Sequence, residues 1–255
     1  MSNLNAIVTA GGSGIGRVVA EQLTARGDRV FICDATAESV RDAVSQPGIA
    51  GGVVADVTSE ADVDRLMDEA LHTLGSVDLL INTAGTAGPT SPVEDIALAD
   101  WQQCIAVTLD GTFLCTRLVA PIMKAQQSGS IINFSSTAGL FGYPNRTPYA
   151  AAKWGVIGFT KSLAMELGPH GIRVNAICPG AVGGERMDRV IAAEALATGR
   201  TESAVREGYK RCTSLRTFVS AEDIANTILF LTSPAGARIS GQSLAVDGHT
   251  ESMGC

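Results

Sequence analysis

Short apolar runs alternate with longer segments of helical periodicity along the whole chain, and this alternation constrains the fold more than any other feature. Runs that are apolar on both faces are typical of strands in a parallel sheet whose crossover helices cover both sides. The sequence therefore predicts an α/β fold with a seven-stranded parallel sheet. The expected strands are residues 4–10, 29–33, 51–56, 77–82, 129–136, 172–180 and 242–248. The expected helices are residues 14–26, 36–45, a segment after Ser59, about 98–126, 147–168, 185–216 and 221–233.

One domain is expected over residues 1–255, because no linker, repeat or break in composition divides the chain. Residues 185–216 are polar and helical, and they follow the sixth expected strand. We expect them to form a lid over a substrate site. Ser59 and Asp62 have the spacing of an N-terminal capping box.

Charge and composition exclude several classes of function. The net charge of −7 and the pI near 5.0 argue against a nucleic-acid partner and against an anionic membrane surface. The sequence contains neither an apolar run long enough for a membrane span nor a signal-peptide pattern. The six cysteines are scattered, which favours free thiols in a cytoplasmic protein. The three histidines lack the spacing of metal ligands, so we expect no metal site.

The stretch TAGGSGIG, residues 9–16, joins the first expected strand to the first expected helix. Glycines at such a junction permit positive φ and let the backbone approach a pyrophosphate, which the helix N-terminus stabilises. No lysine follows, so the loop is not a P-loop. It predicts a single-domain, Rossmann-like, doubly wound fold that binds a dinucleotide through Gly11, Ser13, Gly14, Ile15 and Gly16.

Asp34 ends the second expected strand, where a carboxylate can accept hydrogen bonds from the adenosine ribose. The alternative is a solvated carboxylate that caps the next helix. A carboxylate at this position would repel a 2′-phosphate, and neither neighbour is basic. Asp34 therefore favours NAD over NADP as the cofactor.

The stretch TPYAAAKWG places Tyr149 and Lys153 four residues apart. Alanine is the best helix former, so both side chains should project from one helix face, with Thr147 as the cap and Pro148 in the first turn. A free tyrosine has a pKa near 10, and a neighbouring lysine cation favours the phenolate. The pair can therefore supply a base near neutral pH, although a purely structural polar pair is the alternative.

These motifs together resemble the short-chain dehydrogenase/reductase family over essentially the whole chain. TAGGSGIG is similar to the T-G-x-x-x-G-x-G cofactor loop of the family, NTAG (82–85) to its N-N-A-G segment, and YAAAK to its Tyr-x-x-x-Lys motif. The resemblance implies a homotetramer. It also implies further cofactor contacts from Asp56, Val57, Asn82, Ala84, Gly85, Lys153, Pro179, Gly180 and Val182.

The resemblance implies that Tyr149 is the general acid/base and that Lys153 lowers its pKa and binds the nicotinamide ribose. Ser136 lies thirteen residues before Tyr149, the usual separation in the family, and its hydroxyl would polarise the substrate carbonyl. The neighbouring Ser135 is the alternative candidate for this role.

Two positions depart from the family pattern. Thr108 stands in VTLDGTF where many members have an asparagine that holds a proton-relay water, so Thr108 either rebuilds the relay or reduces turnover. Gly184 stands where a threonine often binds the carboxamide. Neither change affects Ser136, Tyr149 or Lys153.

The expected lid carries seven basic and five acidic side chains in an acidic protein. Arg186 and Arg146 are candidates to pair with a substrate carboxylate, phosphate or sulfonate. The alternative is a solvated helix pair whose charges pair within each helix.

We expect an NAD-dependent oxidoreductase that interconverts a secondary alcohol and a ketone on a small polar, potentially anionic substrate, such as a hydroxy acid or a sugar derivative. The alternatives are a 3-oxoacyl thioester reductase and a nicotinamide-binding protein with reduced catalysis.

Overall fold

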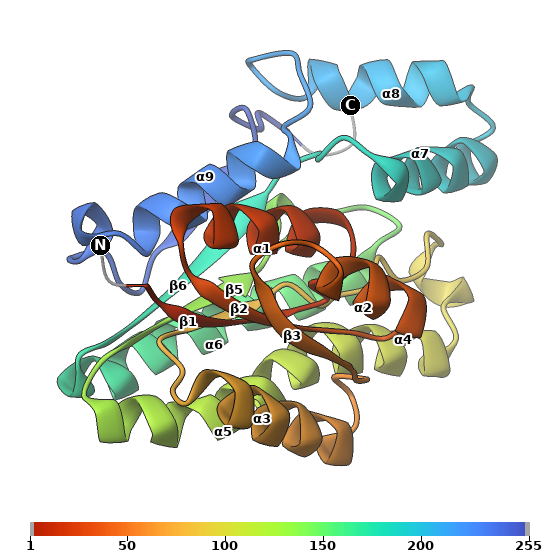
Figure 1. Cartoon of the computed structure of the whole chain (residues 1–255). Coiled ribbons are helices and arrows are strands. Elements are labelled where there is room, and N and C mark those ends of the chain that lie inside the picture. The colour runs from red at the N-terminus through yellow and green to blue at the C-terminus, as the bar shows by residue number, and fades with distance from the viewer. Residues whose placement is uncertain (1–2, 253–255) are drawn as a thin grey trace.

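Seven parallel strands form one sheet in the order β3-β2-β1-β4-β5-β6-β7 (Figure 1). The structure, a computed structural model, describes residues 3–252. The chain starts at the centre of the sheet, moves outward to β3 and returns to β4 on the other side of β1. The predicted doubly wound, Rossmann-like sheet is thereby confirmed. Its strands are β1 (Asn5–Thr9), β2 (Arg29–Asp34), β3 (Ile49–Val54), β4 (Leu79–Asn82), β5 (Gly129–Phe134), β6 (Ile172–Pro179) and β7 (Ser243–Val246).

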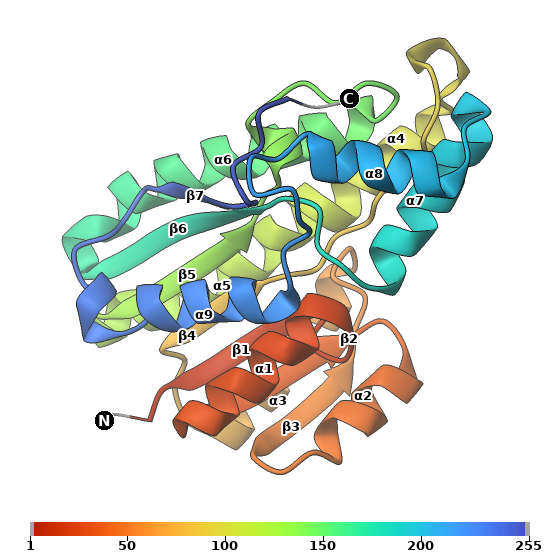
Figure 2. The same cartoon turned by 90° about the horizontal axis from the view of Figure 1, so that it is seen from above.

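Helices cover both faces of the sheet, as Figures 1 and 2 show. Alternate strand residues enter opposite apolar clusters, with Ile7 in one and Val8 in the other. This explains why the strands read as continuous apolar runs. The helices on one face are α1 (Gly14–Arg26), α2 (Ala37–Val44) and α9 (Ala221–Leu231). Those on the other are α3 (Glu60–Leu74), α5 (Gly111–Gln126) and α6 (Thr147–Leu167).

The largest error in the predicted strands is at β3, which begins two residues before the expected residue 51. Gly51 and Gly52 lie inside this strand rather than at its start. A β-carbon on either glycine would lie 2.9 Å from a side chain of β2, Phe31 or Ile32 respectively. Glycine is therefore used here for close packing between strand and neighbouring side chains, and not as a turn residue.

Two predicted helix caps differ from the structure. Ser59 caps α3 by accepting from the Asp62 backbone, but the Asp62 carboxylate accepts from the Asp56 backbone and leaves the capping box incomplete. At α6, Thr147 is the first helical residue, and its buried hydroxyl has no partner among the described residues. Arg146 occupies the N-cap position instead, and its side chain makes no capping hydrogen bond.

The predicted helix over residues 98–126 is continuous but irregular. It consists of α4 (Leu98–Ile105), the π turn η2 (Ala106–Asp110) and α5. By length and composition alone, Leu98–Gln126 could cross a membrane, which differs from the sequence expectation. Its buried side chains nevertheless pack into the core beneath the sheet, as those of a core helix do.

The predicted lid consists of two helices, α7 (Glu185–Thr198) and α8 (Glu202–Arg211). They pack on each other through their own apolar cluster, which includes Met187, Ile191 and Val205. Figure 1 shows this pair projecting from the main body beyond the end of β6. The lid is therefore placed over the carboxyl ends of the central strands, where parallel sheets bind ligands.

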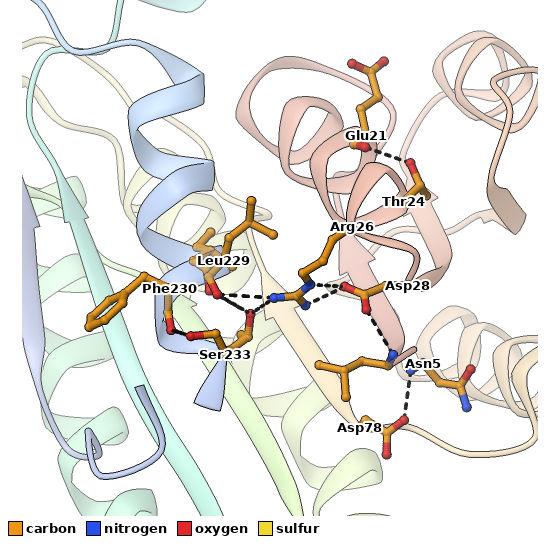
Figure 3. Close-up of polar contacts among 12 residues, drawn as sticks. Asn5, Glu21, Thr24, Arg26, Asp28, Asp78, Leu229, Phe230 and Ser233 are labelled. Atoms are coloured by element: carbon orange, nitrogen blue, oxygen red, sulfur yellow. Dashed lines mark hydrogen bonds and ion pairs between the residues drawn. The ribbon is translucent and has the colours of Figure 1, made fainter. Parts of the chain in front are cut away.

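A charged cluster fixes the opposite, amino-terminal edge of the sheet (Figure 3). The Arg26 guanidinium lies 2.5 Å from the Asp28 carboxylate and donates to the Thr232 hydroxyl at 2.7 Å. Asp28 also accepts from the backbone of Leu4 at 3.0 Å. The cluster thereby joins the end of α1, the entry to β1 and the end of α9. This edge of the sheet is structural, which leaves the carboxyl edge for chemistry.

The expectation of free thiols throughout is wrong for Cys212, which is disulfide-bonded. Cys255 lies outside the described residues. The remaining four cysteines are free and buried: Cys33, Cys104, Cys115 and Cys178. Burial raises the pKa of the Cys115 thiol to about 12, so this side chain packs as a small apolar group.

Candidate active site

Lys153 and Ser135 lock α6 onto the carboxyl end of β5. The buried Lys153 ammonium donates to the carbonyl of Phe134, the last residue of β5, at 2.7 Å. In return the Ser135 hydroxyl donates to the Lys153 carbonyl at 2.8 Å. A β-carbon at Gly139 would lie 2.3 Å from the Ser135 hydroxyl oxygen, so this contact also requires glycine there. Sequence reasoning missed Gly139, because its constraint comes from two distant elements.

The structure separates the two candidate serines. The Ser135 hydroxyl donates to the helix backbone, whereas the Ser136 hydroxyl contributes to lowering the pKa of Tyr149. Ser136 also accepts from the backbone of Ala138 at 3.2 Å, which orients its side chain. The geometry therefore favours Ser136 as the group that can hold a substrate oxygen.

Tyr149 and Lys153 project from the same face of α6, with the ammonium nitrogen 5.6 Å from the centre of the tyrosine ring. Burial by itself would raise the pKa of Tyr149. The positive charge of Lys153 is the largest effect that lowers this pKa. Smaller lowering effects come, in order of size, from Arg186, the Ser136 hydroxyl and Arg146. Together they bring the pKa of Tyr149 below its ordinary value of 10.0. Burial also lowers the pKa of Lys153, although the nearby phenolate opposes this. The pair is thus arranged to exchange protons.

Both predicted substrate arginines lie near Tyr149. The Arg146 guanidinium lies 5.3 Å from the ring centres of both Tyr143 and Tyr149. Arg186 belongs to the first turn of α7, and its charge acts on both Tyr149 and Lys153. The lid and the segment before α6 therefore contribute one cation each.

Thr108 lies in the π turn and is buried, and its hydroxyl has no hydrogen-bond partner among residues 3–252. A β-carbon placed on Gly85 would lie 3.4 Å from the Lys153 nitrogen and 3.7 Å from the Thr108 hydroxyl oxygen. The hydroxyl and the ammonium thus face the same small space beside Gly85.

The glycine loop has the geometry expected of a dinucleotide cradle. Gly14 has φ +52°, and a β-carbon there would meet nothing within 4 Å, so the first turn of α1 is open. At Gly16 a β-carbon would lie 2.2 Å from the Ala10 carbonyl oxygen, which requires glycine. Ala10, where the family loop has glycine, keeps a positive φ of 48°, which costs about 1 kcal/mol. The residues present therefore fit a bound pyrophosphate.

Asp34 lies beside this loop at the end of β2. One of its carboxylate oxygens accepts from the Gly12 backbone at 3.2 Å and from the Ser13 hydroxyl at 3.4 Å. The buried Asp34 side chain thus fixes the loop and also places a negative charge where the second strand ends. Ile15, one residue inside α1, packs against the apolar cluster beneath it.

The remaining predicted cofactor residues lie at the same edge of the sheet but differ in exposure. Asp56 is exposed and Val57 is buried, and both follow β3. Asn82 is buried and donates to Thr116 at 3.2 Å and Asn133 at 2.9 Å, so its side chain has no surface for direct ligand contact. Ala84 donates through its backbone to Thr9 at 3.1 Å.

Beyond β6, the segment that contains Pro179, Gly180 and Val182 leads into the lid. A β-carbon at Gly180 would lie 2.7 Å from that of Asp247, so packing against the end of β7 requires this glycine. Val182 pairs with Val219 in an isolated parallel bridge. Gly184 adopts φ +126° at the N-cap of α7, a conformation that strains a threonine. This conformation gives a physical reason for glycine, and not threonine, at position 184.

Comparison with known proteins shows the family to which the chain belongs. A family model described as enoyl-(acyl carrier protein) reductase matches residues 9–249. A 3-oxoacyl-[acyl-carrier-protein] reductase from Synechocystis sp. is 39% identical over 249 residues, 95% of each chain. The chain belongs to the short-chain dehydrogenase/reductase family. Family membership makes it an oxidoreductase that acts on alcohols or ketones.

Two solved members of this family show that the fold accommodates either nicotinamide cofactor. NAD+-bound xylitol dehydrogenase has a TM-score of 0.92 and 28% identity, and the match covers 95% of this chain and 97% of that one. Actinorhodin polyketide ketoreductase with NADPH has a TM-score of 0.93 and 30% identity, and the match covers 96% of both chains. The choice of cofactor therefore depends on local residues.

Sequence reasoning missed a hydrogen-bonded chain that joins the lid of this short-chain dehydrogenase/reductase to the segment before α6. The Tyr209 hydroxyl on α8 donates to Glu194 on α7 at 2.6 Å and lies 2.5 Å from the Tyr143 hydroxyl. Tyr143 in turn contacts Arg146. These residues lie far apart in sequence and form no motif, so only the fold shows their connection.

We predict that Tyr209→Phe loosens the lid, because it removes both hydroxyl contacts while keeping the ring. The loss of hydrogen bonds worth about 1–2 kcal/mol should accelerate amide hydrogen exchange in α7 and α8 roughly tenfold. Hydrogen-exchange mass spectrometry measures this directly. Thr198→Val is the control, because the exposed Thr198 hydroxyl bonds only within α7. Unchanged exchange in α8 of Tyr209→Phe would contradict the role of the chain.

Proposed function

We propose that this protein is an NAD-dependent oxidoreductase that interconverts a secondary alcohol and a ketone on a small polar substrate. The observation that carries the proposal is the Ser136–Tyr149–Lys153 arrangement at the end of β5. In this arrangement nearby cations lower the pKa of the half-buried Tyr149. An acid/base whose pKa approaches the working pH is what proton transfer to and from an alcohol oxygen requires.

In the oxidative direction Ser136 holds the substrate hydroxyl and Tyr149, as phenolate, accepts its proton. Lys153 stabilises that phenolate through its charge, while its bond to Phe134 fixes the ammonium in place. In the reductive direction the Tyr149 phenol returns the proton to the ketone oxygen. When bound, the nicotinamide supplies the acceptor or donor of hydride. Thr108, beside Lys153, is placed to hold a water that exchanges this proton with solvent.

The glycine loop and Asp34 are the residues that would hold the cofactor. The open first turn of α1 can accept the pyrophosphate, and Asp34 can accept from the ribose hydroxyls. The negative charge of Asp34 and the absence of a basic neighbour in the sequence support NAD over NADP.

A 3-oxoacyl thioester reductase is the second candidate, and the name of the Synechocystis relative favours it. Asp34 counts against it, because that chemistry commonly uses NADPH. A pocket of about 310 Å³, lined by Thr86–Pro89, Asp100, Gln103 and Cys104, lies next to the Ala87 carbonyl that accepts from Arg146. A nicotinamide-binding protein with reduced catalysis is the third candidate, supported by Thr108 in place of asparagine.

We also propose a homotetramer in the cytoplasm. An open groove between α5 and α6 includes Phe113 and Phe159, whose rings meet edge to face at 6.3 Å. Phe113 is 44% exposed, so a second copy could cover this apolar surface. The four buried free thiols support a reducing compartment, whereas the disulfide at Cys212 counts against it.

The test of the proposed function is steady-state turnover with NAD and NADP across polyols, sugars, hydroxy acids and 3-hydroxyacyl thioesters. We expect NADH formation with a small polar alcohol and a loss of at least about 10³-fold in kcat in Tyr149→Phe, because the acid/base is removed. Turnover that survives Tyr149→Phe would contradict the mechanism. Activity confined to the thioesters with NADP would establish the second candidate.

We predict that Asp34→Asn weakens the preference for NAD over NADP, because it removes the charge that repels a 2′-phosphate. The ratio of NADH to NADPH affinity, measured by fluorescence titration, should fall by roughly tenfold or more. Asp42→Asn on the exposed end of α2 is the matched control for one lost charge. If Asp34→Asn lowers the affinity for NADH and for NADPH equally, Asp34 acts through the loop and does not select between the two cofactors.

A further inference from the structure

Arg146 is a buried cation without a counter-ion. Its side chain belongs to a residue only 4% exposed, and one guanidinium nitrogen donates to the Ala87 carbonyl at 2.6 Å. The Nε atom has no hydrogen-bond partner, and no carboxylate of residues 3–252 lies within ion-pair distance of this guanidinium. A buried charge is normally paired, because burial without a partner is costly. Arg146 therefore retains an unused capacity to bind an anion.

Arg146 lies next to Tyr149, so an anion bound to it would lie close to the reaction centre. Its guanidinium is held between the rings of Tyr143 and Tyr149, at 5.3 Å from each ring centre. The Tyr143–Tyr209–Glu194 chain fixes the first of these rings. The cation is thus rigidly placed beside the phenol that would accept the substrate proton.

Arg186 is an exposed cation of the lid, and its charge acts on both Tyr149 and Lys153. Four other lid cations form ion pairs, which are Arg189–Glu185, Arg206–Asp188, Lys210–Glu207 and Arg216–Glu251. Arg186, Arg200 and Arg211 form none among the described residues, and of these three only Arg186 acts through its charge on Tyr149 and Lys153. It lies in the first turn of α7, where a cation is unfavourable because the helix N-terminus is itself positive. No side chain caps that N-terminus, so the amides of Glu185 and Arg186 remain for an anion, although those of Met187 and Asp188 donate to the Gly184 carbonyl. The carboxylates of Glu185 and Asp188 in the same turn oppose an anion there, so the arginine side chains must supply most of the attraction.

We propose that the substrate carries a small oxyanion, a carboxylate, phosphate or sulfonate, that binds between Arg146 and Arg186. The inference rests on the proposed function, and it specifies the substrate class: hydroxy acids or their phosphorylated or sulfonated counterparts, with the reacting carbon close to the charged end. Two guanidinium groups on separate elements can share one oxyanion, which would also draw the lid towards α6.

The test uses unreactive probes, so that it does not depend on turnover. Butyrate, inorganic phosphate and methanesulfonate are titrated, at constant ionic strength, into the protein saturated with NADH, which occupies the pyrophosphate site. Butyramide and methanesulfonamide are the neutral counterparts. At least one anion should bind tenfold or more tightly than the neutral probes. Which of the three binds best identifies the anionic group of the substrate.

Four variants separate the roles of the arginines. Arg186→Gln should weaken binding of the preferred anion by roughly 10- to 100-fold, and Arg186→Lys should retain part of it. Arg189→Gln is the control, because Arg189 lies one turn away and pairs with Glu185, and this variant should leave anion binding unchanged. Arg146→Lys keeps the charge but loses the planar contact with both rings. The Arg146→Lys variant should lower the affinity for the anion with little change in the melting temperature.

Equal affinity for anionic and neutral probes, or no effect of Arg186→Gln, would overturn the inference. A loss of NADH affinity in Arg186→Gln, with anion binding otherwise unchanged, would assign Arg186 to the cofactor phosphates and would also overturn it. Tyr149-dependent turnover of neutral alcohols alone would reject the anion site while leaving the proposed function intact. Failure of the wild-type protein to bind NADH would instead reject the proposed function.

Discussion

The rest of the site depends on the buried ammonium of Lys153. It donates to the carboxyl end of β5, faces the ring of Tyr149 and shares a small space with Thr108 and Gly85. A buried ammonium is stable only where carbonyl groups or a negative charge surround it. The phenolate of Tyr149 supplies that charge, so the two pKa values are coupled. The end of a parallel strand thereby becomes a place where a tyrosine can act as a base.

Much of this arrangement could be predicted from the sequence, because it depends on local signals. The alternating apolar runs predicted the strands, and the four-residue spacing predicted that Tyr149 and Lys153 share a helix face. The π turn was not predicted, because residues 98–126 are uniformly compatible with an α-helix and the extra residue changes only the hydrogen-bond ladder. The Thr147 cap was wrong because Arg146 occupies that position, held by two aromatic rings.

Contacts between distant segments could not be predicted at all. Tyr143 and Tyr209 are 66 residues apart, and nothing in either local sequence indicates that their hydroxyl groups meet. The need for glycine at positions 139 and 180 also comes from neighbours in other elements. In contrast, both candidate substrate arginines were found from sequence position alone. What the structure adds is that neither forms an ion pair among residues 3–252, and that Arg146 is buried while Arg186 is exposed.

The most direct test of the central claim is the titration of the three tyrosines by NMR, with each phenol carbon isotopically labelled. Burial raises the pKa values of Tyr143 and Tyr209, whereas the cations around Tyr149 lower its pKa. As pH rises, one resonance should therefore shift first, with a pKa below 10.0, and Tyr149→Phe should remove it. In Lys153→Met the pKa of Tyr149 should rise. A Tyr149 resonance that titrates at or above its ordinary value in the wild type, or that ignores Lys153→Met, would contradict the account.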